Sequence, residues 1–446
     1  MVRIFKKIDY DKLSPKFRRF VNICLGWHPF GYPYKKLKII GVTGTNGKTT
    51  TTTLLYRVAK SLGYKVGLIG TVENFIDDKE VSEDFYTKGS FLSKIFYTSS
   101  PTTPEIWELN KLLSEMVKEG CEYVFMEITS HGTEEKRVNG IQFIGGLFTN
   151  LTQDHLDYHK SMDKYFLAKK KFFEMLPKQA FALTNADDER GKSMLEGVKA
   201  RCMLYGFDQC QRPSLTNECQ GRPLTCFCGK IRKSDFDGLE LDFNGSVIKS
   251  KLIGAFNAYN LLSVWSVCEL LGFDVSKVKK VLENIEPPKG RFDHFMSDSG
   301  VLAIVDYAHT PDALEKVLLT VREVKPRENK TIAVFGCGGD RDTTKRPKMG
   351  NIGVALSDVP IFTSDNPRSE DPNKIISDMA AELFPDDLKK IKMIADRREA
   401  IKEAVRIAKK GDVIICAGKG HEDYQETNGV KSHFDDMEEL RLAFKK

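Results

Sequence analysis

The stretch GVTGTNGKTT, which starts at Gly41, contains the residue types that hold a polyphosphate. It follows the apolar run KLKII and precedes a segment with a helical pattern. In that context the backbone N–H groups of a glycine-rich turn and of a helix N-terminus face the phosphates. Lys48 would reach the β- and γ-phosphates, and the Thr49 hydroxyl would bind Mg²⁺. A tight turn with a helix cap would not need this lysine and threonine beside Gly44 and Gly47, so we predict a nucleotide site.

The loop is longer than the common phosphate loop. Five residues separate Gly41 from Gly47, whereas the pattern G-x-x-x-x-G-K-[ST] has four.

Two side chains further along the sequence are candidates for holding a metal ion beside this loop. Glu127, in FMEITSH, ends a predicted strand that points toward the loop, where a carboxylate can hold a cation. His155, in NLTQDHLDYH, stands in an Asp-His-Leu-Asp string after another predicted strand. That setting favours a metal ligand over an ordinary core or surface histidine.

Short apolar runs alternate with helical patterns from Lys36 onward, which predicts an α/β fold. KLKIIGVTG, EYVFMEITS and GGLFTNLT are predicted strands, helices are predicted over 48–62 and 104–120, and hairpins over 201–250. A second α/β series begins near Pro287 with LAIVDYA, KTIAVFGCGG, VPIFTSDN and DVIICAGKG. We predict a P-loop ATPase domain with a mostly parallel sheet, followed by a Rossmann-like α/β domain. The predicted boundaries are 1–35 for a short N-terminal stub, 36–286 for the central ATP-binding domain and 287–446 for the C-terminal domain.

Charge and composition exclude several classes of protein. The formal net charge is only +6, from 68 basic and 62 acidic residues, which argues against a nucleic-acid partner. No apolar stretch approaches the roughly 18 residues of a membrane span, and the N-terminus lacks the apolar core of a signal peptide. We expect a cytoplasmic protein that is a monomer, acts on small molecules and keeps its ten cysteines as reduced thiols.

TGTNGKTT, NLTQDHLDYH and YFLAK together resemble the Mur ligases, whose phosphate loop has this longer form. The resemblance extends from about Lys36 to the C-terminus. Enzymes of this family use ATP to activate a carboxylate as an acyl phosphate, which an amine then attacks. The resemblance implies an ADP-forming acid–amino-acid ligase that positions its substrates and uses no protein nucleophile. The residues that it places on ATP are Gly44, Thr45, Asn46, Gly47, Lys48, Thr49, Thr50, Asn257, Arg291 and Asp306.

The resemblance also implies metal ligands and catalytic residues. Lys169 matches the family's carbamylated lysine through the pattern Y-x-x-A-K, whereas the residues alone do not distinguish it from Lys170 or Lys171. A carbamate is anionic and so helps to hold Mg²⁺, which an ammonium would repel. For Asn257, in GAFNAYNLL, a helix N-cap is the alternative to an adenine contact. The implied metal ligands are Thr49, Glu127, His155 and carbamylated Lys169, and the implied catalytic residues are Lys48, His155, Lys169, Arg291 and His309.

The segment SDNPRSEDP, which starts at Ser364, is similar to the D-N-P-R signature of family members that add meso-diaminopimelate to a UDP-muramoyl dipeptide. Diaminopimelate ends in a second carboxylate, which the guanidinium of Arg368 would bind through two parallel hydrogen bonds. Lysine-adding relatives lack this arginine, since lysine ends in an ammonium. An Asx-Pro turn is the alternative, but Asp-Asn-Pro would suffice for it. The resemblance places diaminopimelate on Arg341, Asp365, Asn366, Arg368, Gly418 and Glu422, and the muramoyl substrate on Thr102, Thr103, Thr129 and Arg137.

The short lead before the loop is where the sequence departs from these relatives. They carry a small UDP-binding domain there, which we expect residues 1–35 to replace with a basic, aromatic stub. One alternative is therefore a ligase of the same chemistry that acts on an acceptor without UDP, such as a muropeptide, a free peptide or a folate-like glutamate. Another is a nucleotide-binding descendant without activity. The retained Lys48, Glu127, His155 and Lys169 argue against this last alternative.

Overall fold

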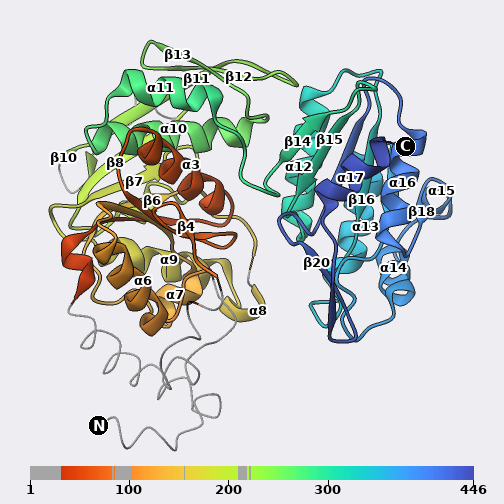
Figure 1. The fold of residues 1–446 in the computed structure, drawn as a ribbon, viewed down its shortest axis with the longest axis horizontal. Helices are drawn as coiled ribbons and strands as arrows, with labels where there is room; N and C mark the ends of the chain where they lie inside the picture. Colours follow the sequence, from red (N-terminus) through yellow and green to blue (C-terminus); the bar gives the residue numbers. More distant parts are fainter. Residues whose placement is uncertain are drawn as a thin grey trace, which may run out of the picture. The chain divides into compact units, whose positions relative to one another are not determined.

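The computed structural model describes residues 32–82, 85, 102–154, 156–208, 218–219 and 222–445. The chain divides into two compact units (Figure 1). Unit 1 comprises Met1–Arg232, Leu241–Ser250 and Phe256–Ile285, and unit 2 comprises Lys233–Glu240, Lys251–Ala255 and Glu286–Lys446. Among the described residues, no helix combines the length and the apolar character that crossing a membrane requires.

Unit 1 is built on an 11-stranded sheet with the order β13-β12-β11-β8-β7-β6-β1-β5-β2-β3-β4. Its central pairs, from β8 through β7, β6, β1 and β5 to β2, are parallel, whereas β2, β3 and β4 pair antiparallel. The strands are β1 (Lys38–Thr43), β2 (Val66–Ile69), β3 (Asn74–Ile76), β4 (Lys79–Glu80), β5 (Tyr123–Glu127), β6 (Phe143–Phe148), β7 (Phe181–Asn185), β8 (Arg201–Gly206), β11 (Thr225–Asp235), β12 (Gly238–Phe243) and β13 (Ser246–Ser250). A small separate hairpin joins β9 (Glu218–Cys219) to β10 (Arg222–Pro223).

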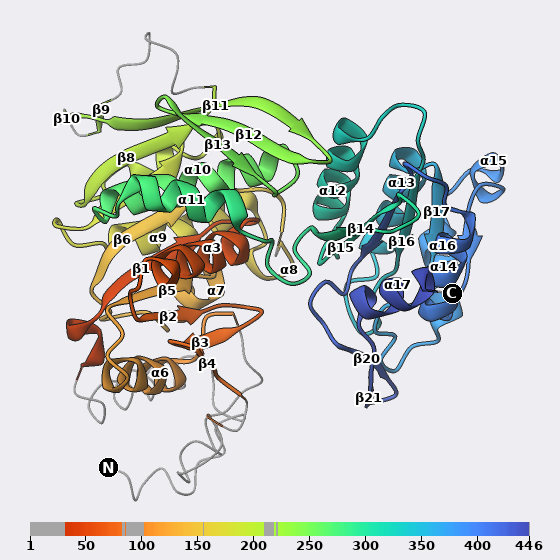
Figure 2. The same cartoon turned by 45° about the horizontal axis from the view of Figure 1, so that its top comes forward.

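Helices cover both faces of this sheet, as the continuous burial of its central strands requires. Figure 2 shows α3, α10 and α11 side by side, and α3 packs against β1, β2 and β5. Side chains of α6 and α9 share a hydrophobic core with alternate strand residues such as Ile39, Val124 and Met126. The helices are η3 (Pro33–Lys36), α3 (Lys48–Ser61), α6 (Ile106–Lys118), α7 (Ser130–Glu134), α8 (Leu156–His159), α9 (Met162–Glu174), η4 (Ser193–Leu195), α10 (Ala255–Leu270) and α11 (Val275–Asn284).

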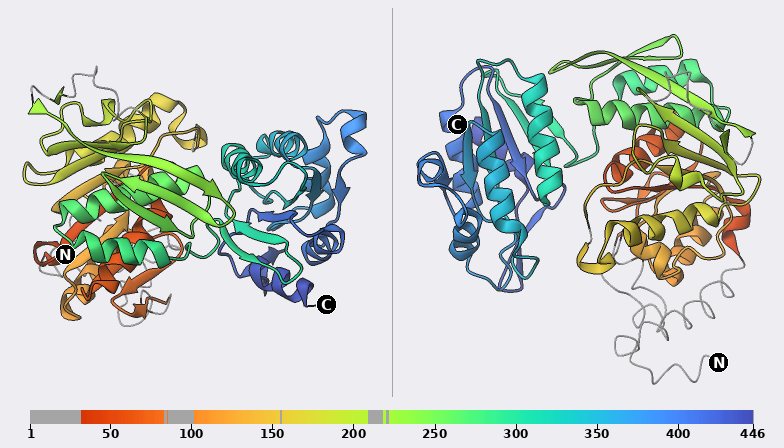
Figure 3. Two further views of the ribbon diagram at one scale, coloured as in Figure 1. Left: turned by 90° about the horizontal axis from the view of Figure 1, so that it is seen from above. Right: turned by 180° about the vertical axis from the view of Figure 1, so that it is seen from behind.

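Unit 2 contains a six-stranded sheet with the order β14-β15-β19-β16-β17-β18, in which only β14 is antiparallel to its neighbour. Helices cover both of its faces (Figure 3), and one face buries α16 and α17 in a common hydrophobic core. The strands are β14 (Asp293–Met296), β15 (Leu302–Asp306), β16 (Thr331–Phe335), β17 (Val359–Phe362), β18 (Lys392–Met393) and β19 (Val413–Ala417), with a separate hairpin of β20 (Tyr424–Thr427) and β21 (Val430–His433). The helices are α12 (Pro311–Val324), α13 (Lys345–Leu356), α14 (Pro372–Ala380), α15 (Pro385–Leu388), α16 (Arg397–Ile407) and α17 (Asp436–Phe444).

The predicted fold class is confirmed: a large, mostly parallel sheet precedes a second α/β unit. The predicted helix over 104–120 is α6, which begins at Ile106 because Glu105 is its N-cap and forms a capping box with Glu108. The expectation of ten reduced thiols is wrong for Cys226, which is disulfide-bonded. Free thiols are found at Cys121, Cys202, Cys228, Cys268, Cys337 and Cys416.

Candidate functional site

The phosphate loop of unit 1 lies between β1 and α3, and its backbone conformation requires glycine. Gly44 and Gly47 have φ angles of 152° and 83°. A Cβ on Gly44 would lie 1.9 Å from Thr149 Oγ1, which leaves no room for a side chain. The first turn of α3 contains Lys48 and Thr49 and no acidic residue. The N–H groups at this helix N-terminus and the positive end of the helix dipole therefore favour an anion.

The segment that follows β6 holds this loop in place. The N–H groups of Thr45 and Asn46 donate to the backbone oxygen and to Oδ1 of Asn150, at 2.8 Å and 2.9 Å. Thr149 Oγ1 donates to the carbonyl of Asn46 at 2.7 Å. These contacts form because β1 and β6 are parallel neighbours, so their carboxyl ends meet at the same edge of the sheet.

Two lysines from different elements converge on the loop. Lys48 Nζ donates to the carbonyls of Gly44 and Thr45 at 3.1 Å and 2.7 Å. Lys169 Nζ, from α9, also donates to the Gly44 carbonyl, at 2.7 Å. Burial and the nearby Lys48 lower the pKa of Lys169 well below its ordinary value, although Asp154 opposes the shift. Both effects favour the neutral form of the Lys169 amine.

The three consecutive lysines of α9 lie in different surroundings. Lys169 is 1% exposed, whereas Lys170 and Lys171 are directed toward Glu196 and Glu134, at 3.7 Å and 3.4 Å. Burial thus distinguishes the three residues, which the sequence alone does not.

Glu127 lies at the same sheet edge as the phosphate loop, since it ends β5 and pairs with Val42 of β1. The residue is fully buried, and its carboxylate accepts hydrogen bonds from the N–H and Oγ1 of Thr71 at 2.8 Å and 3.0 Å. The third predicted metal ligand, His155, lies outside the described residues. Within the described part of the chain, no three His, Cys, Asp or Glu side chains gather as a metal site. Among the described residues, Thr49 and Glu127 offer oxygen atoms of the kind that Mg²⁺ prefers.

Three threonines expected to bind the muramoyl substrate gather at the end of β5. Thr103 Oγ1 donates to the Glu127 carbonyl at 2.9 Å and accepts from the N–H of Thr129 at 2.9 Å. Thr102 Oγ1 lies within hydrogen-bonding distance of Thr71 Oγ1, at 3.0 Å. The same hydroxyl of Thr71 contacts the Glu127 carboxylate, so these threonines connect directly to the candidate metal ligand.

The guanidinium of Arg137 contacts the segment that contains Thr103. It donates to the carbonyl of Thr103 at 2.8 Å and pairs with the carboxylates of Glu105 and Glu135. Its side chain is mostly buried, at 11% exposed, so it orders the Thr103 segment in this structure.

Asn257 lies inside α10, as its third residue, and is not an N-cap. Its Oδ1 accepts from Asn260 Nδ2 at 3.1 Å. Oδ1 of Asn260 in turn accepts from the Thr51 hydroxyl at 3.4 Å and lies 2.6 Å from where a Cβ on Gly47 would stand. The two asparagines therefore connect α10 to the phosphate loop.

In unit 2, Asp306 ends β15 with both carboxylate oxygens hydrogen-bonded. They accept from the N–H groups of Phe292 and Ala308 at 2.7 Å and 2.9 Å. Burial raises the pKa of Asp306 to about 6, although Arg291 and the two N–H groups lower it. The guanidinium of Arg291 lies over the ring of Tyr307, 4.6 Å from its centroid.

His309 belongs to the same end of β15. Its Nδ1 is hydrogen-bonded to the Tyr307 carbonyl at 2.8 Å. The ring of His421 also lies beside Tyr307, with centroids 5.0 Å apart. The structure thus brings Arg291, Asp306 and His309 together at one end of the sheet of unit 2.

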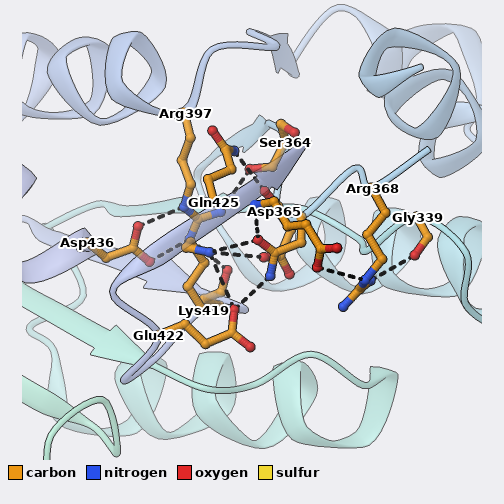
Figure 4. A network of polar contacts seen from close by, with 12 residues as sticks. Gly339, Ser364, Asp365, Arg368, Arg397, Lys419, Glu422, Gln425 and Asp436 are labelled. Atoms are coloured by element: carbon orange, nitrogen blue, oxygen red, sulfur yellow. Dashed lines mark hydrogen bonds and ion pairs between the residues drawn. The ribbon is translucent and has the colours of Figure 1, made fainter. Parts of the chain in front are cut away.

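A polar cluster forms where β17 and β19 end (Figure 4). We call it the DNPR cluster, and its members are Asp365, Asn366, Arg368, Lys419, Glu422 and Gln425. Asn366 Nδ2 donates to Glu422 Oε2 at 2.7 Å, and Lys419 Nζ donates to Asn366 Oδ1 at 3.2 Å. Gly418, with a φ of 118°, lets Asp365 approach, because a Cβ there would lie 3.1 Å from Asp365 Oδ2.

The charges of the DNPR cluster are mixed. Lys419 is fully buried, with Nζ 3.4 Å from Glu422 Oε2 and 3.9 Å from Asp365 Oδ1. Burial and the neighbouring Asp365 raise the pKa of Glu422, and Lys419 offsets part of that shift. A ligand ammonium beside these two carboxylates would be stabilised by their negative charge.

Arg368 has a left-handed backbone, with a φ of 51°, that the β20–β21 hairpin supports. Its N–H donates to the Glu426 carbonyl at 3.0 Å, and its carbonyl accepts from Asn428 at 2.6 Å. In the side chain, Nη1 donates to the Gly339 carbonyl at 2.8 Å, and Nε lies 3.5 Å from Glu426 Oε2. Gly339 N–H also donates to the Asn366 carbonyl at 2.9 Å. The loop that carries the exposed Arg341 is therefore docked on the DNPR segment.

Several residues of the site were missed by the sequence-based predictions. Lys419 stands between two glycines after a predicted strand, in AGKGHE, a signal that could have drawn attention to it. Asn260 repeats the asparagine of FNAYN one helical turn later, which places both on one helix face. For Thr71, Arg397 and Gln425 the sequence carries no comparable signal, since their partners are distant in the chain.

The chain matches two family models in succession. Residues 42–268 match the Mur ligase middle domain, and residues 290–420 match the Mur ligase glutamate ligase domain. Curated relatives extend the similarity. UDP-N-acetylmuramoyl-L-alanyl-D-glutamate–2,6-diaminopimelate ligases are 48% identical in Parabacteroides distasonis and 42% identical in Clostridioides difficile. The alignments cover 93% and 92% of this chain and 79% of each relative.

Solved structures agree with these matches. A structure of a UDP-N-acetylmuramoyl-L-alanyl-D-glutamate–2,6-diaminopimelate ligase has a TM-score of 0.62 at 31% identity, over 92% of this chain and 78% of that one. A folylpolyglutamate synthase from Mycobacterium tuberculosis has a TM-score of 0.69 over 91% and 92% of the two chains, but at 17% identity it reflects the fold alone.

Proposed function

The chain belongs to the Mur ligase family, and we propose that it joins meso-diaminopimelate to the D-glutamyl carboxylate of UDP-N-acetylmuramoyl-L-alanyl-D-glutamate with hydrolysis of ATP to ADP and phosphate. The observation that carries the choice of amine is the DNPR cluster, in a chain 48% identical to diaminopimelate ligases. It combines Arg368, whose guanidinium lies near the carboxylate of Glu426, with the carboxylates of Asp365 and Glu422, which lie near Lys419. That mixture of charges suits an amino-acid head group, which presents a carboxylate and an ammonium together.

ATP is proposed to bind through its triphosphate to the loop of unit 1. The N–H groups at the start of α3 would face the phosphates, and Lys48 would turn from its two carbonyl partners to the β- and γ-phosphates. Asn257 would contact the adenine. Asp306, Arg291 and His309, which lie together in unit 2, would contact the ribose and phosphates.

Mg²⁺ is proposed to bind beside the loop, on Thr49, Glu127 and His155. When bound, it would neutralise charge on the phosphate oxygens during transfer. We propose that Lys169 is carbamylated, because its buried amine lies near Lys48 with a lowered pKa. A neutral amine attacks carbon dioxide through its nitrogen lone pair and loses a proton. The resulting anion offsets the charge of Lys48 and offers an oxygen ligand.

The reaction is proposed to proceed in two steps. An oxygen of the D-glutamyl side-chain carboxylate attacks the γ-phosphorus of ATP, the bond to ADP breaks, and an acyl phosphate forms. The amine of diaminopimelate then adds to the acyl carbon, the nitrogen loses a proton, and phosphate leaves as the amide forms. This chain supplies placement and charge: Lys48 and Arg291 for the phosphates, and the DNPR cluster with Gly418 and Arg341 for the amine substrate.

The muramoyl dipeptide is proposed to bind at the end of β5, where Thr102, Thr103 and Thr129 gather beside Glu127. Arg137 would support these threonines or meet an acidic group of the substrate. We further propose that 36–286 forms the ATP-binding domain and 287–446 the amino-acid-binding domain.

A coupled assay of ADP release tests this function. The full chain is supplied with ATP, Mg²⁺ and the UDP-muramoyl dipeptide, and with meso-diaminopimelate, L-lysine or no amine. ADP release that requires diaminopimelate, together with a product whose mass corresponds to the new amide, is the expected result. Equal turnover with lysine would contradict the role of Arg368.

The acceptor is varied in the same assay. A muramoyl dipeptide without UDP and a folate-like glutamate replace the natural acceptor in parallel reactions. Turnover that does not depend on UDP would favour a ligase for another acceptor. Binding of ATP without ADP release from any mixture would favour a nucleotide-binding protein without ligase activity.

A further inference from the structure

Arg397 is a buried cation that the proposed chemistry does not use. It begins α16, is 1% exposed, and donates from Nε and Nη2 to the two carboxylate oxygens of Asp436, each at 2.7 Å (Figure 4). Asp436 begins α17 and is fully buried. Burial opposes the charge on Arg397, but Asp436 outweighs it and raises the pKa of the guanidinium. Because burying an ion pair is costly, stability alone is a weak reason for the pair.

The remaining donors of Arg397 reach two strand ends. Nη1 lies 3.4 Å from the carbonyl of Ser364, after β17, and Nη2 lies 3.1 Å from the carbonyl of Ala417, the last residue of β19. In the sheet, β16 separates β17 from β19, so no ladder hydrogen bond connects these two ends. One guanidinium therefore bridges two strands that are not neighbours.

The residues that follow these two carbonyls form the DNPR cluster. Asp365 and Asn366 come directly after Ser364, and Gly418 and Lys419 come directly after Ala417. The two segments are in tight contact, with Lys419 Nζ 3.2 Å from Asn366 Oδ1. Binding sites require their groups to be held within about 0.5 Å of the productive geometry.

We propose that Arg397 is a positioning residue, which holds the ends of β17 and β19 in the relative position that the DNPR cluster needs to bind the amine substrate. This inference rests on the proposed function, since it takes diaminopimelate as the ligand of the cluster. Arg397 itself touches no substrate. Its loss would therefore weaken the binding of the amine and leave the binding of ATP and of the muramoyl dipeptide intact.

The next residue along the chain provides a matched control. Arg398 donates from Nε and Nη2 to the two carboxylate oxygens of Glu439, at 2.8 Å and 2.7 Å. This pair also connects α16 to α17, but the side chain of Arg398 is 47% exposed and bonds neither strand end. The two pairs connect the same helices with the same geometry, but only the Arg397 pair is buried and contacts the ends of β17 and β19.

The experiment compares three variants of the full chain. Arg397→Lys keeps the charge opposite Asp436 but lacks the fork needed to reach both carbonyls. The double variant Arg397→Gln with Asp436→Asn removes both buried charges, so neither is left unpaired. Arg398→Gln with Glu439→Gln is the control. KM is measured for diaminopimelate, ATP and the UDP-muramoyl dipeptide, together with the midpoint of thermal unfolding.

Both Arg397 variants are expected to raise KM for diaminopimelate by about 10-fold or more, as loss of supporting contacts does at other sites. Their KM values for ATP and the dipeptide should stay within about twofold of the unaltered chain, and the control should match that chain in all three. An unchanged KM for diaminopimelate, or an equal rise in KM for all three substrates, would show that Arg397 only stabilises the fold. That result would contradict the inference about Arg397 but not the proposed function. Absence of amine-dependent ADP release by the unaltered chain would overturn the proposed function, and the inference with it.

Discussion

The phosphate loop of unit 1 comes from one continuous stretch of sequence, whereas the DNPR cluster of unit 2 is assembled from separate ones. The loop needs only residues 44–50 and the support of the strand beside it. The cluster needs the segments 365–368 and 418–426, held by a glycine loop and by Arg397. Local conformation determines the first site, and tertiary packing determines the second.

The two regions also differ in charge. Lys48 and Lys169 converge on one carbonyl beside the loop, and burial together with this proximity lowers the pKa of Lys169. The DNPR cluster instead sets the carboxylates of Asp365 and Glu422 against the buried Lys419. The first arrangement suits a polyanion and the second a ligand with both charges. Substitutions in the phosphate loop should therefore affect every step after ATP binding. Substitutions in the DNPR cluster should affect only the binding of the amine substrate.

Replacing Lys48 with alanine is expected to have the largest effect. The variant removes the cation nearest the proposed path of the phosphoryl group, so turnover should fall by about 10³-fold or more. ADP release at saturating amine measures it. Lys171→Ala is the matched control, since its side chain is 53% exposed and pairs with Glu134. A loss of similar size in the control, or an active Lys48→Ala chain, would contradict the role of the loop.

Replacing Lys169 with alanine should lower turnover by about 10²-fold, because the proposed carbamate is lost from the metal site. Lys170→Ala should leave turnover near that of the unaltered chain. Activity of the unaltered chain should also fall in buffers freed of carbon dioxide and recover when bicarbonate is added. Full activity without carbon dioxide, with no added mass on Lys169 by mass spectrometry of the native protein, would contradict carbamylation.

Replacing Arg368 with lysine tests the role of the DNPR cluster in binding diaminopimelate. Lysine keeps the charge but cannot bind a carboxylate through two parallel hydrogen bonds, so KM for diaminopimelate should rise by about 30-fold, or about 2 kcal/mol. KM for ATP should not change. The preference for diaminopimelate over lysine should shrink in the same measurement. A rise in KM for both diaminopimelate and ATP would contradict the independence of the DNPR cluster and the phosphate loop.

Replacing Asp306 with asparagine probes a titrating group of unit 2 outside the DNPR cluster. Burial raises its folded-state pKa to about 6, from an ordinary value of 3.8, so the folded chain binds this proton more tightly than the unfolded chain. Its contribution to stability is therefore fully present below about pH 4 and is lost as the pH rises through 6. A shift of about two units corresponds to at most about 3 kcal/mol, and partial exposure of the side chain reduces this to on the order of 1–2 kcal/mol.

Urea unfolding of the two chains, at about pH 4.5 and about pH 7.5, measures this effect. The free energy of unfolding of the unaltered chain, relative to Asp306→Asn, should be smaller at the higher pH. A difference that does not vary with pH would show that the carboxyl titrates normally.

Much of the fold and of the nucleotide site could be predicted from sequence because the signals are local. Alternating apolar runs and helices predicted both α/β units, and GTNGKTT predicted a loop whose glycines have the required φ angles. The first residue of α6 could not be predicted exactly. The proline at 104 indicated a helix start, but the helix begins at Ile106, after the N-cap Glu105. The disulfide of Cys226 was also missed, because pairing of cysteines depends on which strands meet.

By itself, then, the sequence determined the residue types of both sites and the conformation of the phosphate loop, since glycine, lysine and threonine act there through neighbouring backbone. Only the tertiary structure decided which of three adjacent lysines is buried at Gly44, that Lys419 and Gln425 join the DNPR cluster, and that Arg397 contacts the strand end beside it. The physical reason is the order of the strands. Parallel strands bring together the ends of segments that are distant in the chain, and their side chains gain partners that no local pattern encodes.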